Sequence, residues 1–371
     1  MNDVQKLVQE AIDRLVDSGT EIGVQVAAYR HGELIVDAVA GVSDPATGRP
    51  VLSSTPFNSF STGKGVTSTV VHVLVDRGVL DYDEPIARLW PEFAAHGKER
   101  TTLRHVLTHS AGVPGLPQAT TPEDLCDWDV TCARIADTEP WWEPGTRTGY
   151  HAQTYGYLVG EVVRRATGTP ISTVLREEIT VPLGIADELF FGVPESDLER
   201  LAVLTDAADS AAMFAAMPPD FPLFAAVPTA VMPTAAYGNR RDVLTADIPA
   251  GGTMTARAVA RMYAALLGEV DGVRLVSPAR LREISAVQTR DVDQVTGHAY
   301  PKALGYNVGR PGTTSEATPG VFGMVGMGGS AAYADSSTGV TVALTKNRFD
   351  PFAPSPVDGI GAIVAELTGG G

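Results

Sequence analysis

The sequence predicts an α/β (α+β) fold in which an antiparallel sheet from both chain termini is flanked by helices and carries a mostly helical inserted domain. The chain has 371 residues, 44% of them hydrophobic, enough for about two domains with a sizeable core. β-rich runs occur near both ends, while apolar residues between positions 80 and 201 recur at helical spacing. We therefore expect residues 1–58 plus 251–371 to form the sheet domain and residues 59–250 the helical domain.

The N-terminal elements follow from simple periodicities. The chain opens with apolar residues at helical spacing, which predicts an amphipathic helix. These residues are Val4, Leu7, Val8, Ile12 and Leu15. Two β-rich runs, residues 22–29 and 34–39, then surround a turn that contains Gly32, which predicts a β-hairpin. Residues 44–54 are rich in turn formers and lead to the first central helix.

The central helices are predicted from spacing and from capping residues. Residues 62–76 carry Val66, Val70 and Leu74 on one face, and Gly78 supplies a C-terminal signal. Further helices are expected over residues 82–90, 102–109, 122–136, 155–167 and 171–178. Thr121 is placed to cap the helix that follows it, and Gly168 to end the one before it.

Residues 204–247 are rich in Ala, Pro and Met and show no clear period. Such a stretch can be a lid or the wall of a substrate pocket, or it can be a tolerated surface insertion, and the sequence leaves both open. The remaining elements are helices over residues 253–267, 277–286 and 357–367 and strands over 303–308, 330–335 and 340–346. The last two strands are joined by a hairpin turn at 336–339, and glycines 369–371 are expected to fray.

The composition argues against some classes of binding partner. The net charge of −16 and a pI near 4.8 argue against nucleic acid and anionic membranes, and we expect no membrane partner. The longest apolar run, residues 224–236, is broken by Pro228 and Pro233. No signal-peptide pattern opens the chain, and Cys126 and Cys132 are expected to be reduced thiols of a cytoplasmic protein. No metal, phosphate-loop or dinucleotide pattern is present, so we expect no cofactor; the oligomeric state is left open.

The Ser-x-x-Lys pattern occurs once, at Ser61 and Lys64. At the first turn of a helix, Ser61 would lie among free backbone N–H groups, and Lys64 would project from the same side. If this helix is buried, desolvation lowers the pKa of Lys64, which could then accept the serine proton. Alternatively, Ser61 is a helix cap and Lys64 is a solvated surface residue. The pattern alone favours this second interpretation.

Two further stretches favour the catalytic interpretation of Ser61 and Lys64. The segment WWEPGTRTGYHA at 141–152 places Tyr150 just before a helix, and the segment GMVGMGGS at 323–330 leads into a strand. In this order the three motifs resemble those of the serine β-lactamase/penicillin-binding-protein superfamily, most closely the branch with class C β-lactamases and family VIII carboxylesterases. The segment LRHVLTHSAG at 103–112 and the pair Asn347-Arg348 resemble other parts of the same family. The resemblance covers the chain apart from residues 204–247, and it implies the β-lactamase/transpeptidase-like fold.

The resemblance implies a role for each matching residue. Ser61 would be the nucleophile, Lys64 its base or proton holder, and Tyr150 the group that relays the proton to the leaving group. A Lys64 ammonium nearby could lower the pKa of that phenol. The backbone N–H groups of Ser61 and Met327 would form the oxyanion hole. The substrate pocket is expected to include His151, Trp142, Met324, Gly326 and Gly328.

Two departures from the family pattern bear on the substrate. The tyrosine motif reads Tyr150-His151-Ala152, without the asparagine that would bind a β-lactam amide, and Met324 stands where the family has a charged or polar residue. Both favour a neutral ester over a β-lactam. No Gly-x-Ser-x-Gly elbow is present, and a triad role for His109 or His151 is less expected than a core or loop position.

The resulting expectation is a serine hydrolase, most simply a carboxylesterase, that forms an acyl-enzyme on Ser61 with a small-molecule ester or amide substrate. The first alternative is an acyltransferase that passes the acyl group to an amine or alcohol in secondary metabolism. A β-lactamase or D-peptidase, and a non-catalytic binding protein, rank lower, the latter because both Lys64 and Tyr150 are retained.

Overall fold

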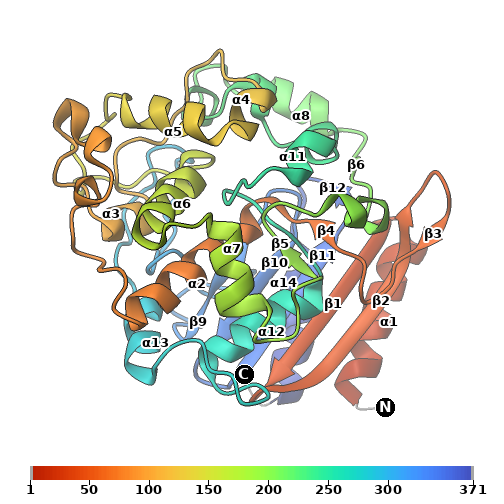
Figure 1. The fold of residues 1–371 in the computed structure, drawn as a ribbon. Coiled ribbons are helices and arrows are strands. Elements are labelled where there is room, and N and C mark those ends of the chain that lie inside the picture. The colour runs from red at the N-terminus through yellow and green to blue at the C-terminus, as the bar shows by residue number, and fades with distance from the viewer. Residues whose placement is uncertain (1–2, 369–371) are drawn as a thin grey trace.

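The computed structural model describes residues 3–368, so the expected fraying of glycines 369–371 lies outside the described residues (Figure 1). Its main sheet has seven strands in the order β3-β2-β1-β11-β10-β9-β8, all paired antiparallel. The strands are β1 (Gly23–Arg30), β2 (Glu33–Asp44), β3 (Arg49–Pro50), β8 (Asn307–Val308), β9 (Val321–Val325), β10 (Ala331–Asp335) and β11 (Val340–Lys346). Because β1 pairs with β11, both ends of the chain form the centre of the sheet. The predicted fold class is confirmed.

Helices cover both faces of this sheet. Helices α1 (Asp3–Asp17) and α14 (Val357–Thr368) pack against one face, and α12 (Ala256–Leu267) packs against the other (Figure 1). Seven of the eight residues of β1 are therefore buried. Since strand side chains alternate, Val24 and Val26 contact the first layer while Ala27 and Tyr29 contact the second.

The predicted hairpin between β1 and β2 turns through two residues, His31 and Gly32. Both have positive φ, 50° and 86°, and Arg30 pairs directly with Glu33. This is the backbone of a type I′ turn, whose twist matches that of the flanking strands.

The helical part of the chain surrounds α2 (Gly63–Asp76), which is buried along 13 of its 14 residues. Its other α-helices up to residue 175 are α3 (Leu103–Leu107), α4 (Pro122–Cys126), α5 (Trp128–Ala136), α6 (Thr154–Thr167) and α7 (Ile171–Leu175). Helix α2 contacts α6 and α7 on one side and β9 on the other. A single hydrophobic core runs from these helices to the sheet, so the expected division at residues 58 and 250 stays a prediction.

Several predicted boundaries are corrected by local hydrogen bonding. The expected helix 122–136 is two helices, because Asp127 is extended and its side chain caps the second by accepting from Val130 N–H. The expected helix 253–267 begins at Ala256, capped by Thr255, and the residues before it form strand β7 (Thr253–Met254). Gly168, with φ of 77°, ends α6 as predicted.

Other elements differ in extent. The expected helix 82–90 is only a 3₁₀ turn, Ile86–Arg88, and the expected helix 171–178 passes into a π turn at Arg176–Thr180. The expected strand 303–308 is reduced to β8, because Gly305 has φ of 77°. Strand β9 was not predicted, since its sequence was assigned to the glycine-rich motif.

The irregular stretch 204–247 holds only short elements. They are β6 (Thr205–Asp206), α8 (Ser210–Ala216), α9 (Pro222–Ala226), a 3₁₀ turn (Thr229–Val231), α10 (Ala235–Gly238) and α11 (Arg241–Thr245). Strand β6 pairs with β12 (Arg348–Phe349), directly after the last strand of the main sheet. Among residues 3–368 no helix is both long and apolar enough to span a bilayer.

Candidate active site

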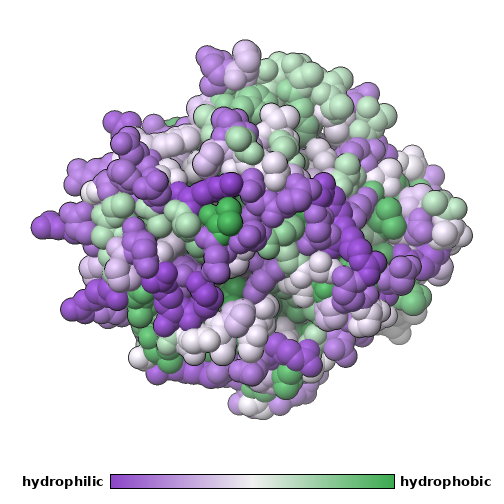
Figure 2. All heavy atoms as spheres, turned by 45° about the horizontal axis from the view of Figure 1, so that its top comes forward, coloured by the Kyte–Doolittle hydropathy of each residue, from purple (hydrophilic) through white to green (hydrophobic). Residues whose placement is uncertain are grey.

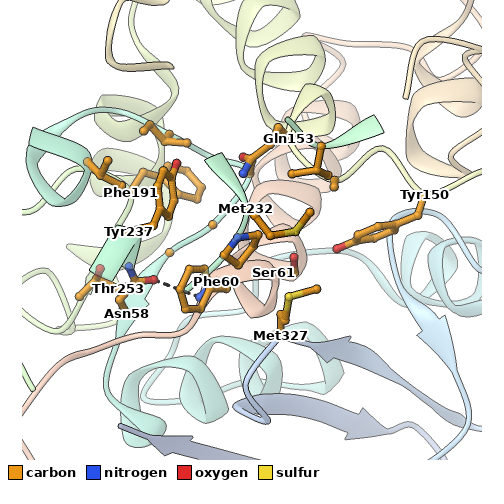
Figure 3. A pocket seen from close by; sticks show the side chains of 18 of the residues that line it. Asn58, Phe60, Ser61, Tyr150, Gln153, Phe191, Met232, Tyr237, Thr253 and Met327 are labelled. Atoms are coloured by element: carbon orange, nitrogen blue, oxygen red, sulfur yellow. Dashed lines mark hydrogen bonds between the residues drawn. The ribbon is translucent and has the colours of Figure 1, made fainter. Parts of the chain in front are cut away.

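Ser61 lies on a strained turn at the start of α2. The preceding residue, Phe60, has φ of 44°, an uncommon conformation for a side-chain-bearing residue. Its N–H donates to Asn58 Oδ1 at 3.1 Å, which holds the turn. Gly63 leaves room for a neighbouring loop, because a Cβ there would lie 2.1 Å from the carbonyl oxygen of Gly251. Ser61 is thereby presented, half-buried, at the wall of a pocket (Figure 3).

Lys64 is buried directly behind Ser61, with only 1% of its surface exposed. Its Nζ lies 3.0 Å from Ser61 Oγ and donates to the carbonyl oxygen of Ala250 at 2.7 Å. Burial lowers the pKa of Lys64 to about 7, because the low-dielectric interior disfavours its charge. Ser61 makes no capping hydrogen bond for α2, whose N-cap is Thr62. The cap-and-solvated-lysine interpretation is therefore wrong.

The Tyr150 hydroxyl points toward Ser61 (Figure 3). Lys64 Nζ lies 5.1 Å from the centre of the Tyr150 ring. Burial raises the pKa of Tyr150 well above its ordinary value, and the Ser61 side chain that it faces offsets this only in part. The expectation that Lys64 lowers this pKa is wrong, because the amine sits over the ring face and its own charge is disfavoured. Tyr150 is therefore a protonated phenol at neutral pH.

A buried carboxylate fixes the backbone at Tyr150. Asp293 Oδ1 accepts the N–H groups of Tyr150, Val295 and Thr296, each at 3.0 Å. Its Oδ2 lies 3.1 Å from Lys302 Nζ, and the two side chains are 1% and 4% exposed. Desolvation alone would raise the pKa of Asp293, but Lys302 and the three N–H donors together hold it below its usual value. One ion pair thus orients both Tyr150 and the pocket residue Thr296.

The glycine-rich loop between β9 and β10 approaches the same turn. Thr62 Oγ1 donates to the carbonyl oxygen of Ser330 at 2.9 Å, which ties the loop to the start of α2. Among the described residues, neither the Ser61 N–H nor the Met327 N–H has an acceptor, and both residues line the pocket. Both N–H groups are therefore free to donate to a substrate oxygen, as the predicted oxyanion hole requires.

The pocket beside Ser61 is mostly apolar. Residues 204–247 form one wall of it, through Leu223, Val227, Met232, Pro233, Tyr237 and Val243. Phe191, Ile248 and Ala152 continue the apolar surface, while Gln153 and Thr253 add polar groups. None of its lining residues carries a charge. Of the two interpretations left open for residues 204–247, the pocket wall is the one observed.

Three of the five residues expected in the pocket, His151, Trp142 and Met324, lie behind it. His151 is fully buried, with Nδ1 bonded to the Gly149 carbonyl at 2.7 Å and Nε2 accepting from Val113 N–H. Trp142 packs against Gly149 beneath the same loop. Met324 is buried in β9 against α2, where a Cβ on Gly65 would touch it.

The two glycines predicted in the pocket, Gly326 and Gly328, instead allow close packing of the loop. A Cβ at Gly326 would lie 2.2 Å from the Ser59 carbonyl oxygen, so this glycine allows the loop to approach the Ser61 turn. Gly328, with φ of 96°, faces the Phe349 ring and does not line the pocket. Met327, expected only as an N–H donor, contributes its side chain to the pocket wall (Figure 3).

His109 does not form a triad with Ser61. Its Nδ1 accepts the His151 N–H at 3.1 Å, and its ring packs against that of Tyr150 at a tilt of 47°, with centroids 5.0 Å apart. Burial holds the pKa of His109 well below its ordinary value, so it is a neutral core histidine. Its role is to support the tyrosine ring.

The described residues include no group of three or more His, Cys, Asp or Glu side chains that could hold a metal ion. Both Cys126 and Cys132 are free, and burial raises the pKa of each thiol. Sequence reasoning missed Ala250, Asp293 and Lys302. The Gly251-Gly252 pair beside Ala250 is a usable signal for a close backbone approach, but nothing in the sequence links Asp293 to a tyrosine 143 residues away.

Comparisons with known proteins show similarity over most of the chain. The model of the family described as "Beta-lactamase" matches residues 8–365. The chain is 37% identical over 341 residues to the esterase/beta-lactamase LipL of Mycobacterium tuberculosis, covering 88% of this chain and 77% of that protein. It is 30% identical to the esterase EstB of Burkholderia gladioli over about half of each chain, 49% and 50%. The crystal structure of a family VIII carboxylesterase superposes with a TM-score of 0.86 at 32% identity, covering 99% of this chain and 97% of that one.

Proposed function

We propose that this chain, which belongs to the β-lactamase family and is a serine hydrolase, is a carboxylesterase that forms its acyl-enzyme on Ser61. The observation that carries the proposal is the Lys64 amine, buried 3.0 Å from Ser61 Oγ with its pKa lowered to about 7. A neutral amine at that position can take the serine proton, which nucleophilic attack by serine requires.

In acylation, Ser61 Oγ attacks the ester carbonyl while its proton passes to Lys64 Nζ. The negative charge that develops on the carbonyl oxygen is stabilised by the N–H groups of Ser61 and Met327. The carbonyl of Ala250 accepts a hydrogen bond from Lys64 Nζ and supports its new charge. Collapse of the tetrahedral intermediate breaks the ester C–O bond and leaves the acyl group on Ser61.

Tyr150 supplies the proton to the departing alkoxide. As a protonated phenol at the Ser61 side chain it is a general acid, and acylation leaves it as a phenolate near the Lys64 ammonium. In deacylation the roles reverse: water gives a proton to the Tyr150 oxygen as it adds to the acyl carbonyl. Lys64 Nζ then returns its proton to Ser61 Oγ as the acyl C–O bond breaks and the acid is released.

The pocket favours a neutral acyl group. Its lining residues carry no charge that could bind a carboxylate, and Ala152 lacks the amide of the family asparagine. Met324 is buried behind the pocket and cannot replace the missing charge. These features argue against β-lactam and D-peptide substrates.

Acyl transfer is a second outcome of the same intermediate. An alcohol or amine that reaches acyl-Ser61 before water would give transfer in place of hydrolysis. Measuring product ratios with and without an added alcohol or amine distinguishes the two, and exclusive hydrolysis excludes transfer.

A panel of p-nitrophenyl esters, amides and the lactam nitrocefin tests the proposal. We expect ester hydrolysis that disappears in Ser61→Ala, with slow or absent turnover of nitrocefin. Full ester turnover in Ser61→Ala, or nitrocefin turnover faster than that of every ester, would overturn it.

A further inference from the structure

The two backbone N–H groups of the predicted oxyanion hole belong to separate segments of the chain. Ser61 follows the strained turn at Phe60, and Met327 lies in the glycine-rich loop between β9 and β10. Phe60, Ser61 and Met327 lie together at one side of the pocket (Figure 3). A donor stabilises an oxyanion only when its nitrogen lies about 2.7–3.1 Å from that oxygen. The separation of the two segments must therefore be fixed closely.

The Phe349 side chain contacts both of these segments. Its ring meets that of Phe60 with centroids 5.2 Å apart and planes tilted by 60°. In the loop, a Cβ added to Gly328 would lie 2.6 Å from Cδ2 of the Phe349 ring. Phe60 immediately precedes Ser61, and Gly328 immediately follows Met327. One side chain thus contacts the neighbours of both N–H donors.

The backbone of Phe349 is held in place by contacts outside this loop. Its carbonyl oxygen accepts the Ala207 N–H at 2.9 Å, where β12 pairs with β6. Two residues before it, the Asn347 side chain donates to the carbonyl oxygens of Val42 and Ser43 at 3.0 and 3.3 Å. The Phe349 side chain is only 2% exposed. Because its backbone is anchored and its ring is closely packed, the ring acts as a rigid spacer.

The chain around Phe349 also holds the loop through hydrogen bonds. Ser355 Oγ donates to the Gly329 carbonyl oxygen at 2.6 Å, and Ser330 Oγ accepts the Lys346 N–H at 3.2 Å. Together with the ring contact at Gly328, residues 346–355 therefore bind three consecutive residues of the loop. The position of Met327, directly before these three residues, follows from this attachment.

We propose that Phe349 is a positioning residue for the oxyanion hole, an inference that rests on the proposed esterase function. It holds the turn before Ser61 and the loop around Met327 at the separation that the developing oxyanion requires. The ring does not line the pocket, so it acts through the two backbone N–H groups. Because the oxyanion forms only in the transition state, a shift of these groups lowers kcat and leaves KM nearly unchanged.

The variant Phe349→Leu tests this role, since leucine keeps an apolar side chain but does not fill the space of the ring. We expect kcat on a p-nitrophenyl ester to fall about 10- to 100-fold with KM within about twofold of the wild-type value, because outright removal of one oxyanion donor costs about 10²- to 10³-fold. The pH dependence of kcat/KM should keep the wild-type midpoint, because Lys64 is not displaced.

The matched control is Phe93→Leu. Burial alone does not distinguish the two rings, because large apolar side chains lie mostly inside the molecule, while hydrophilic residues cover much of the face shown in Figure 2. Phe93 is 0% exposed, and its ring contacts that of Trp90, also with centroids 5.2 Å apart. It lies in the 3₁₀ segment Pro91–Gly97, which packs on α5. This variant should lose a similar amount of stability in denaturant unfolding and keep the wild-type kcat.

Three kinetic results would overturn the proposal. They are an unchanged kcat in Phe349→Leu, an equal loss of kcat in Phe93→Leu, and a loss in Phe349→Leu that appears in KM alone. If Phe349→Leu does not fold, Phe349→Met replaces it, because the flexible methionine side chain fills more of the space, and the same criteria apply.

Fluorophosphonate labelling separates this inference from the esterase function. A wild-type chain that is labelled on Ser61 but hydrolyses no ester would refute the esterase function alone. Labelling of Phe349→Leu at least about tenfold more slowly would then still support the positioning role, because the phosphonyl oxygen occupies the same hole. Labelling at the wild-type rate would overturn that role, and the absence of both labelling and hydrolysis in the wild type would overturn both proposals.

Discussion

The ionisation of Lys64 predicts the pH dependence of the reaction. An ordinary lysine, with a pKa of about 10.5, is neutral in about one molecule in three thousand at pH 7, whereas a pKa of about 7 makes about half of the molecules neutral. This shift corresponds to about 5 kcal/mol of desolvation of the charged form. Because only the neutral amine accepts the Ser61 proton, kcat/KM should fall about tenfold per pH unit below a midpoint near pH 7. Tyr150 has a raised pKa and stays protonated, so a plateau should follow on the alkaline side.

The assay is ester hydrolysis followed in a pH-stat, with stability checked across the range. The matched control is Lys98→Met, since Lys98 is also buried and its Nζ likewise donates to backbone carbonyls, those of Ala95 and Thr138. This variant should keep the acid limb at the same midpoint, while Lys64→Arg should lose activity throughout. A profile that is flat between about pH 5 and 8, or an acid limb near the pKa of a carboxyl group, would refute the role of Lys64.

Three further outcomes follow from the site. Tyr150→Phe should lower kcat by about 10²- to 10⁴-fold in steady-state assays with little change in KM, and an unchanged kcat would remove Tyr150 from proton transfer. Asp293→Asn should destabilise the fold by about 3–5 kcal/mol in denaturant unfolding, because it leaves Lys302 buried without its countercharge. Adding Lys302→Met to that variant should recover part of the loss, and strictly additive effects would contradict the coupling. Met232→Trp, which fills the pocket, should lower kcat/KM for octanoyl relative to acetyl esters by at least about tenfold; an unchanged ratio would place the acyl chain elsewhere.

Local signals in the sequence predicted the elements of the fold well. The Gly32 turn, the capped helix after Thr102 and the glycine stop at Gly168 were all legible because each depends on neighbouring residues. Strand β9 was missed because Gly323 and the loop after it resemble a turn. The break at Asp127 was missed because an aspartate within an amphipathic pattern is equally compatible with a continuous helix.

The residues of the site, like the elements of the fold, could be predicted only where their contacts depend on neighbouring residues. Ser61 and Lys64 lie within one helical turn, so their spacing permits their contact, but the pattern alone favoured a cap and a solvated lysine. The roles of Tyr150 and Met327 could be predicted only from the resemblance to a family in which the motifs have this order. The ion pair of Asp293 and Lys302 depends on tertiary contacts between segments that no local pattern connects. His151 was predicted in the pocket because it is adjacent to Tyr150 in the sequence. Its side chain instead lies on the opposite side of the loop, where Nδ1 bonds the Gly149 carbonyl.

Covalent trapping of the nucleophile tests the central claim most directly. The wild-type chain, incubated with a fluorophosphonate and measured by intact-mass spectrometry and peptide mapping, should gain a single phosphonyl group on Ser61. Ser61→Ala should gain none, and labelling should slow below about pH 7 as Lys64 becomes protonated. An adduct on any other residue, or undiminished labelling of Ser61→Ala, would contradict the account.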